Sequence, residues 1–339
     1  MANLPDIILS RNIFSEFPSS QYKEKYRMQM IDMDLFSELR TIYETTLLDP
    51  HTYRITIKMK DIIDGKLLRE AVDMTMERYP YFRVCLYIKR DAIGFEENPA
   101  EVPVIHTKKR ISLGGKQSSG HLIAFCYWKN RLFIDAYHGL SDGGGIYPLI
   151  RTLLFYYCSS FYGKELSAEG VRLRGSVITK EELEDPARDF ICGKNSLGIK
   201  KWNKPAFQLT DSGIVHIKPD SIVYNVRISE EEFMRMAEHS RCITATVSYT
   251  GKANFGEVER YIQEFEALPS TALPSTHVPL TIEMSALHGY FFINFIQYFD
   301  EYDYFSTFLD QLRQNDIDYD VLNVVEARYP RVELPQWNL

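Results

Sequence analysis

The chain has 339 residues, of which 45% are hydrophobic and 25% are charged. These values are ordinary for a soluble globular protein that is large enough for two lobes. The net charge of −7 gives no reason to expect a nucleic-acid partner. No apolar run reaches the roughly 20 residues of a membrane span. Residues 1–10 lack the pattern of a signal peptide, so we expect a cytoplasmic protein.

The cysteines and histidines do not predict a metal site. The five cysteines form no Cys-x-x-Cys pair, and their number is odd, which favours scattered reduced thiols over disulfides or zinc. These residues are Cys85, Cys126, Cys158, Cys192 and Cys242. Apart from His138, discussed below, the histidines have no metal-ligand spacing either. We expect no metal and no permanently bound cofactor.

The first half of the chain alternates predicted strands and helices. Residues 53–60 alternate apolar and polar side chains, as in a half-buried strand. An Asp64-Gly65 turn leads into a predicted helix, which ends at Tyr79-Pro80 because the residue before proline avoids the helical region. The apolar stripe of this helix comprises Leu68, Ala71, Val72, Thr75 and Met76. A strand over 82–88 follows, and then a hairpin of 120–128 and 131–137.

The hairpin leads to the most informative segment, His138-Gly-Leu-Ser-Asp-Gly143, which two further glycines follow. A predicted helix begins after these glycines, so His138 stands on a strand-to-helix turn. No serine or cysteine is evidently paired with it as a nucleophile. The imidazole could therefore serve as general base toward a bound hydroxyl, amine or thiol. The plainer alternative is architectural: Asp142 caps the helix, and His138 is an ordinary residue at a strand end.

The second half begins after an irregular polar crossover at 164–220. Strands are predicted over 222–228, 241–249, 280–286 and 290–298, with a final helix from about Asp303. Ser229 and Glu232 form a capping box that opens a helix after the first of these strands. Hairpins and helices are interleaved without strict strand–helix alternation. The pattern therefore predicts an α+β fold of two lobes, each a mixed sheet covered by helices.

Two segments resemble the chloramphenicol acetyltransferase-like superfamily, which includes condensation domains and alcohol O-acetyltransferase-like proteins. The hexapeptide at 138–143 is similar to the His-x-x-x-Asp-Gly signature of that superfamily. Residues 78–83, Arg-Tyr-Pro-Tyr-Phe-Arg, are similar to its His-Pro-x-Leu-Arg stretch. The resemblance implies an N-terminal lobe at 1–175, a crossover segment at 176–220 and a reduced C-terminal lobe at 221–339.

The resemblance also implies an activity. Members have a channel between the lobes that admits an acyl donor, acyl-CoA or an acyl carrier protein, from one face and a small-molecule acceptor from the other. By this likeness His138 is the catalytic general base of an acyltransferase. Asp142 pairs with Arg83 to hold the shape of the loop, and Gly143 leaves space beside the base.

Two departures from the family pattern limit this reading. Tyr137 stands where condensation domains have another histidine, which favours ester formation over amide formation. Residues 238–241 make a short join where members have several elements, so the second lobe is predicted to be reduced. Ser248 is a candidate donor to the oxyanion from that lobe. The alternative function is a catalytically impaired relative that acts as a binding or interaction module, with a protein partner or self-association completing the second lobe.

Overall fold

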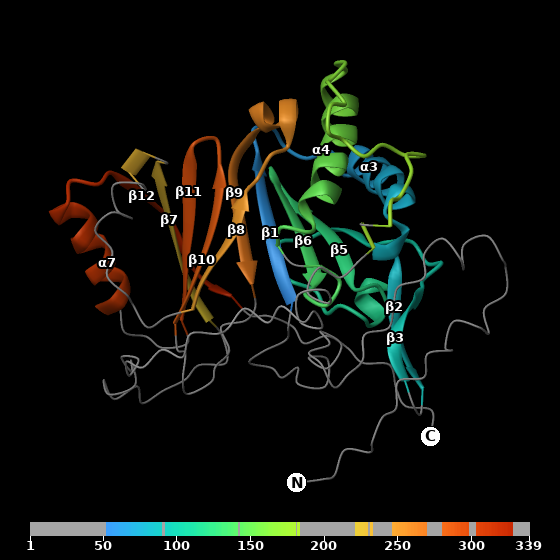
Figure 1. The fold of residues 1–339 in the computed structure, drawn as a ribbon, viewed down its shortest axis with the longest axis horizontal. Helices are drawn as coiled ribbons and strands as arrows, with labels where there is room; N and C mark the ends of the chain where they lie inside the picture. The colour runs from blue at the N-terminus through green and yellow to red at the C-terminus, as the bar shows by residue number, and fades with distance from the viewer. Residues whose placement is uncertain are drawn as a thin grey trace, which may run out of the picture.

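The computed structural model describes residues 52–89, 92–141, 143–180, 182–183, 221–229, 231–232, 246–269, 280–297 and 303–327. Asp142, most of the crossover and the join at 238–241 lie outside these ranges. Two mixed five-stranded sheets stand side by side, with α7 at one end of the molecule and α3 and α4 at the other (Figure 1). The predicted two-lobed α+β fold is confirmed.

The first sheet has the strand order β4-β5-β6-β1-β9. Its strands are β1 (Thr52–Met59), β4 (Val104–His106), β5 (Ile123–Trp128), β6 (Arg131–Tyr137) and β9 (Ile262–Pro269). The predicted hairpin of β5 and β6 is present, and Lys129 takes a positive φ of 54° in its turn. β1 and β6 pair antiparallel, so the strand that ends at His138 lies inside the sheet.

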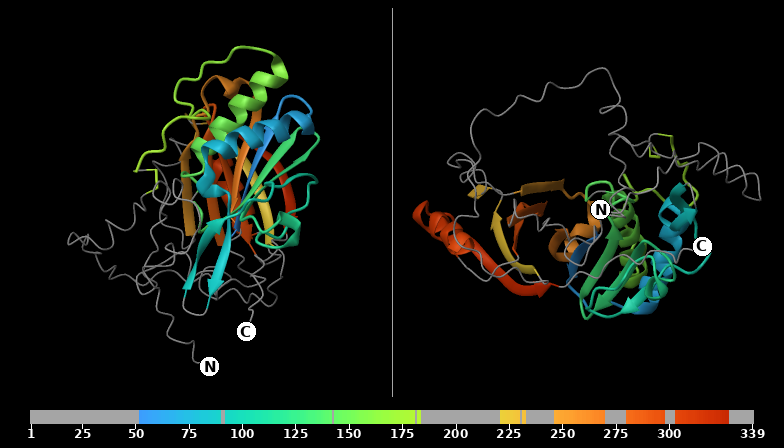
Figure 2. Two further views of the ribbon diagram at one scale, coloured as in Figure 1. Left: turned by 90° about the vertical axis from the view of Figure 1, so that its right-hand side faces the viewer. Right: turned by 90° about the horizontal axis from the view of Figure 1, so that it is seen from below.

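Two helices cover one face of this sheet (Figure 2). α3 (Gly65–Arg78) begins at Asp64, whose carboxylate accepts hydrogen bonds from the backbone N–H groups of Lys66 and Leu67. It buries the stripe predicted from the sequence. α4 (Tyr147–Tyr162) packs beside α3 and ends at Gly163, which has a φ of 59°. Both helices share one apolar core with the sheet.

The opposite face of the first sheet carries a second apolar cluster and a buried ion pair. The hairpin of β2 (Val84–Lys89) and β3 (Ala92–Glu97) contributes Val84 and Leu86 to this cluster. β2 starts later than predicted, because Phe82 belongs to a 3₁₀ turn, η3 (Pro80–Phe82). Arg54 and Asp135 face each other across β1 and β6 and form a bidentate pair of 2.5 and 2.6 Å.

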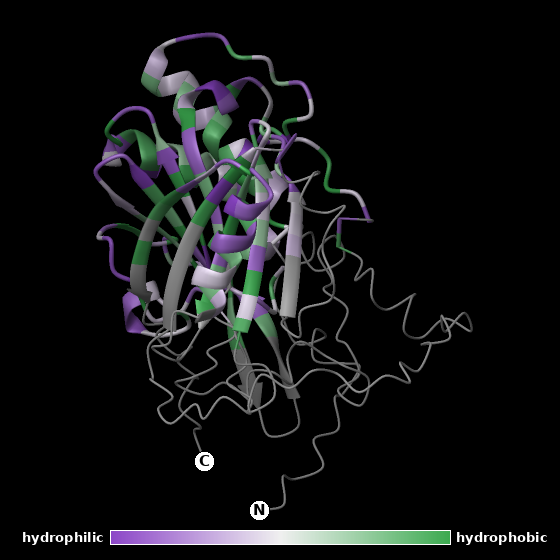
Figure 3. Cartoon of the chain, turned by 90° about the vertical axis from the view of Figure 1, so that its left-hand side faces the viewer, coloured by the Kyte–Doolittle hydropathy of each residue, from purple (hydrophilic) through white to green (hydrophobic). Residues whose placement is uncertain are grey.

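The second sheet has the order β12-β7-β11-β10-β8. Its strands are β7 (Ser221–Ser229), β8 (Thr246–Lys252), β10 (Leu280–Leu287), β11 (Tyr290–Gln297) and β12 (Tyr319–Ala327). α7 (Asp303–Gln314) packs its apolar side on this sheet through Phe305 and Leu312. In Figure 3, hydrophobic and hydrophilic bands follow one another along the strands of this half. One of the two hydrogen bonds of the predicted capping box is present, since the backbone N–H of Glu232 donates to Ser229 Oγ.

β9 joins the two halves of the molecule. It follows η6 (Gly256–Tyr261) in the second half of the chain, yet it pairs antiparallel with β1 in the first sheet. Its backbone carbonyls also accept hydrogen bonds from the second sheet. Ser285 Oγ donates to the carbonyl of Phe265, and Asn294 Nδ2 donates to the carbonyl of Ala267, each at 3.2 Å. The sequence did not predict β9, nor did it predict β3, β4 or β12.

Candidate active site

His138 directly follows β6 and is half-buried. Its imidazole packs edge-to-face on the ring of Tyr53, with the ring centroids 5.6 Å apart and the planes at 77°. Tyr53 lies in β1 opposite Ala136, so the neighbouring strand supplies the surface on which the imidazole rests. The predicted strand-to-helix turn therefore presents the imidazole beside a buried aromatic ring.

Tyr137 and Gly139 determine how the chain leaves the strand. Tyr137 is fully buried, and its backbone carbonyl accepts a hydrogen bond from the N–H of Leu140 at 3.0 Å, which closes a tight turn. A Cβ at position 139 would overlap the ring of Tyr137. The tyrosine that replaces the first histidine of the condensation-domain pattern is thus a core residue that requires a glycine two positions later.

The second lobe reaches this loop through Thr250 of β8. A Cβ at Gly143 would lie 2.6 Å from Thr250 Cγ2 and 3.3 Å from its Cβ. The resemblance implied that Gly143 leaves space beside the base. Where a side chain at Gly143 would point, that space is filled by Thr250 of the second lobe. The loop that carries His138 lies where the two sheets meet.

A chain of hydroxyl hydrogen bonds accompanies this contact. The phenol of Tyr147, in the first turn of α4, donates to Thr250 Oγ1 at 2.7 Å. Thr250 Oγ1 in turn donates to the backbone carbonyl of Met284 in β10 at 3.1 Å. The hydroxyl proton of Thr250 is thus engaged with β10, so in this arrangement Thr250 does not donate to an oxyanion.

Ser248, the candidate oxyanion donor, lies two residues before Thr250 in β8. Its backbone pairs with Glu283 of β10, and its side chain is outside the described part of the structure. The proposed donor role stays a prediction. Thr250 was missed as the contact residue, although Ser248 and Thr250 belong to the same Ser-Tyr-Thr-Gly segment. The only sequence signal for Thr250 was its position before Gly251 and a polar turn.

Arg83 lies at the end of η3 and is half-buried. Its predicted partner, Asp142, is outside the described residues, so the Arg83–Asp142 pair stays a prediction. The charge of Arg83 acts on the fully buried His121. Burial, and to a smaller degree this nearby guanidinium, lowers the pKa of His121, while its hydrogen bond to the carbonyl of Ala100 opposes the shift.

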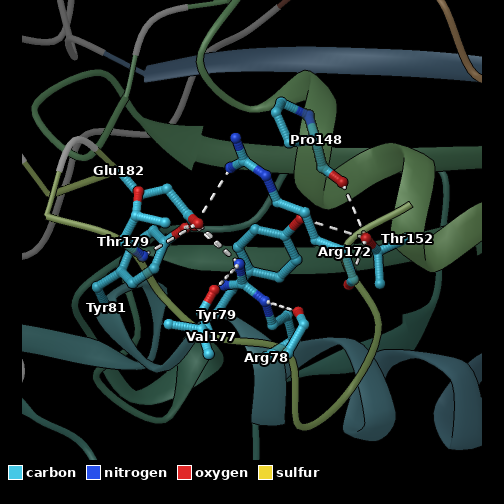
Figure 4. A network of polar contacts seen from close by, with 10 residues as sticks. Arg78, Tyr79, Tyr81, Pro148, Thr152, Arg172, Val177, Thr179 and Glu182 are labelled. Carbon is cyan, nitrogen blue, oxygen red and sulfur yellow. Dashed lines mark hydrogen bonds and ion pairs between the residues drawn. The ribbon is translucent and has the colours of Figure 1, made fainter. Parts of the chain in front are cut away.

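The stretch that resembles the family motif also contains Arg78, which the sequence did not single out. Arg78 is 2% exposed and donates to Glu182 at 2.8 and 3.0 Å and to Ser176 at 2.6 Å (Figure 4). Arg172 and the hydroxyl of Tyr81 also contact Glu182. This network ties the described start of the crossover to the end of α3. The position of Arg78 between Glu77 and Tyr79 gave no specific signal in the sequence.

The described residues contain no group of three or more His, Cys, Asp or Glu side chains placed to hold a metal ion. In the same part of the chain, no helix is both long and apolar enough to cross a membrane. Cys85, Cys126 and Cys158 are free thiols. Burial raises the pKa of Cys126 and of Cys158 to about 12, so neither is an activated nucleophile.

Of the comparisons with known proteins, the one with solved structures bears on the fold. No protein-family model matches the sequence, and no curated protein matches it. Among solved structures, the epimerization domain from the third module of tyrocidine synthetase B is similar with a TM-score of 0.53 and 11% identity, over 83% of this chain and 94% of that one. Polyketide synthase associated protein 5 from Mycobacterium tuberculosis is similar with a TM-score of 0.47 and 10% identity, over 82% and 96% of the two chains.

A third likeness is to a mutant of the starter condensation domain of rhizomide synthetase RzmA, whose structure contains C8-CoA. Its TM-score is 0.49 and its identity is 10%, over 83% of this chain and 93% of that one. The likeness to the tyrocidine synthetase B epimerization domain, with its TM-score of 0.53, shows that the chain has the fold of that domain. At these identities the likeness concerns the fold, and the chemistry has to be argued from the site.

Proposed function

We propose that this protein is a cytoplasmic acyltransferase in which His138 is the general base. The observation that carries the proposal is the contact between Gly143 and Thr250, which brings the histidine loop against the second lobe. In this proposal the lobe at 1–175 supplies the base and the lobe at 221–339 closes the site. The half-buried imidazole on Tyr53 is held in one orientation while it remains within reach of a bound molecule.

The proposed reaction transfers an acyl group from a thioester, acyl-CoA or an acylated carrier protein, to a hydroxyl or amine. The acceptor gives its proton to the imidazole as its oxygen or nitrogen bonds to the acyl carbon. The tetrahedral intermediate then collapses, the carbon–sulfur bond breaks, and the imidazolium returns the proton to the thiolate. No metal or resident cofactor takes part in this scheme.

The tyrosine at position 137, where condensation domains have another histidine, favours an ester-forming over an amide-forming reaction in this proposal. A second histidine at this position would add another titratable group beside His138. Tyr137 instead lies in the core and supports the turn. We therefore expect alcohol acceptors to be used more readily than amines, and His138 to be the only proton carrier that the motif supplies.

The test measures acyl transfer by the wild type and by the His138→Gln variant. A panel of acyl-CoA thioesters is offered with alcohol and amine acceptors, and both free thiol and acylated acceptor are quantified. General base catalysis is worth about 10²- to 10⁴-fold, so the variant should lose at least about 100-fold in kcat. Because His138 is half-buried and follows the end of a strand, the melting temperature of the variant should differ little from that of the wild type.

Equal transfer rates in the two proteins would contradict the role of His138. No transfer by the wild type with any donor and acceptor, together with a co-purifying protein partner or stable self-association, would favour the alternative. In that case the chain would be a binding or interaction module that has kept the fold without the reaction.

A further inference from the structure

The backbone of Gly143 does not itself require glycine. The residues with positive φ in the described structure include eight glycines, and Gly143 is not among them. What excludes a side chain at this position is Thr250, since an added Cβ would meet the methyl carbon Cγ2 at 2.6 Å. At Gly143, the last residue of the histidine motif, the methyl group of Thr250 on the second lobe therefore leaves no room for a side chain.

A bulge in β8 brings Thr250 to this place. Tyr249 pairs with Met284 and Lys252 pairs with Ala286, so Thr250 and Gly251 together stand opposite Ser285 alone. Gly251 takes a φ of 88°, which the bulge requires. Bulges commonly redirect a side chain, and here the redirected side chain meets the first lobe.

Hydrogen bonds fix Thr250 from both sides. It accepts from Tyr147, in the first turn of the helix that follows the motif, and it donates to the carbonyl of Met284. Tyr147 also packs edge-to-face on Phe255 and Phe265, so its phenol has little freedom to turn away. The hydrogen bonds from Tyr147 to Thr250 and from Thr250 to Met284 thus link the start of α4, β8 and β10.

We infer that Thr250 is a positioning residue, which holds the His138 loop against the second lobe through its methyl group on Gly143 and its hydroxyl on Tyr147. The inference rests on the proposed function for its catalytic consequence, but the contact itself can be tested without turnover. If Thr250 positions the loop, changes at Gly143 and at Thr250 should compensate each other, which two independent structural residues would not do.

The first test is a steric rescue. Gly143→Ala introduces the clashing Cβ, and Thr250→Ser removes the methyl group that it meets while keeping the hydroxyl. Overpacking of this kind should speed amide hydrogen exchange of residues 139–147 about tenfold or more in Gly143→Ala. The Gly143→Ala/Thr250→Ser double variant should return exchange close to that of Thr250→Ser alone. If Gly143→Ala does not fold, the double variant should fold.

The second test separates the hydroxyl from the methyl. Thr250→Val keeps the shape and loses the hydroxyl, and Tyr147→Phe loses the donor. Each should speed exchange of the same amides about two- to tenfold. The double variant should be no faster than Thr250→Val, because Thr250→Val already removes the hydrogen bond between Tyr147 and Thr250. In the active enzyme the same variants should lower kcat with little change in the KM for the thioester.

Failure of Thr250→Ser to rescue Gly143→Ala, or additive effects in the second pair, would overturn the inference. These exchange readouts do not depend on acyl transfer. An inactive wild-type protein with the expected rescue would therefore refute the proposed function and keep the positioning contact. An active enzyme without rescue would do the reverse.

Discussion

Two carboxylates on the same face of β9 have different surroundings. Glu264 forms ion pairs with Lys58 at 2.6 Å and with Arg131 at 3.4 Å. Glu266 is 3% exposed, and its Oε1 atom has no hydrogen-bond partner. Burial raises the pKa of Glu266 to about 7; the charge of Glu264 adds to the shift, whereas Arg131 and Lys58 oppose it.

The pKa of Glu266 predicts a pH-dependent stability. The folded protein holds this proton up to about pH 7, whereas the unfolded chain releases it near its ordinary value of 4.5. The stabilisation is therefore complete below the unfolded value and is lost as the pH rises through the folded one. Glu266→Gln should remove this loss, worth up to about 3 kcal/mol.

Urea unfolding of both proteins across this pH window measures the effect. The difference in the free energy of unfolding should grow from acid to neutral pH and then stay constant. Glu165→Gln, which changes an exposed carboxylate, is the matched control and should show no such trend. Parallel curves for Glu266→Gln and the wild type would mean that the pKa of Glu266 is the same in the folded and the unfolded protein.

At the residue scale the sequence predicted part of the site. His138 and Gly143 were found because they belong to a local motif, and the turn around them follows from nearby glycines. Thr250 was missed because its contact depends on a bulge in β8 and on how the two sheets meet. Arg78 was missed for a similar reason, since its partner Glu182 lies 104 residues away in an irregular segment. The catalytic role of His138 and the roles given to Gly143, Asp142, Arg83 and Ser248 all remain predictions.

At the scale of elements, periodicity was sufficient wherever one face of the element meets a core. β1, α3, β6, α4 and α7 have such a face, and the sequence predicted each of them. β9 does not alternate simply, because Glu264 and Glu266 on one face are buried, and so are Phe265 and Ala267 on the other. β4 has only three residues, too few for any period to be read. Strands of this kind are specified by their partners, not by their own pattern.

The position of β9 has consequences for its neighbours. It comes from the second half of the chain, yet the register with β1 extends over most of its length. Its hydrogen bonds to Ser285 and Asn294 take the place of a further strand. These side chains satisfy backbone carbonyls at the edge of the first sheet, where it meets the second.

On the scale of the whole molecule, the placement of β9 in the first sheet predicts one cooperative unfolding transition. The first sheet cannot lose β9 without disturbing the chain between β8 and β10, and the second sheet cannot unfold without exposing the edge of β9. Hydrogen exchange followed through a denaturant series should give coincident midpoints for peptides from β5–β6 and from β10–β11. Two separated midpoints would show that the lobes are independent and that β9 is weakly held.

In the proposed function, substrate binds where the His138 loop meets β8, and a titration with a substrate analogue can locate it. An unreactive thioether of acyl-pantetheine carries the arm that acyl-CoA and acyl carriers share. Adding it should shift the NMR signals of the His138 imidazole and of the Thr250 methyl group together. The indole of Trp128, at the far end of the β5–β6 hairpin, should not move. Saturating ligand that leaves both signals unchanged, or that moves Trp128 alone, would contradict the account.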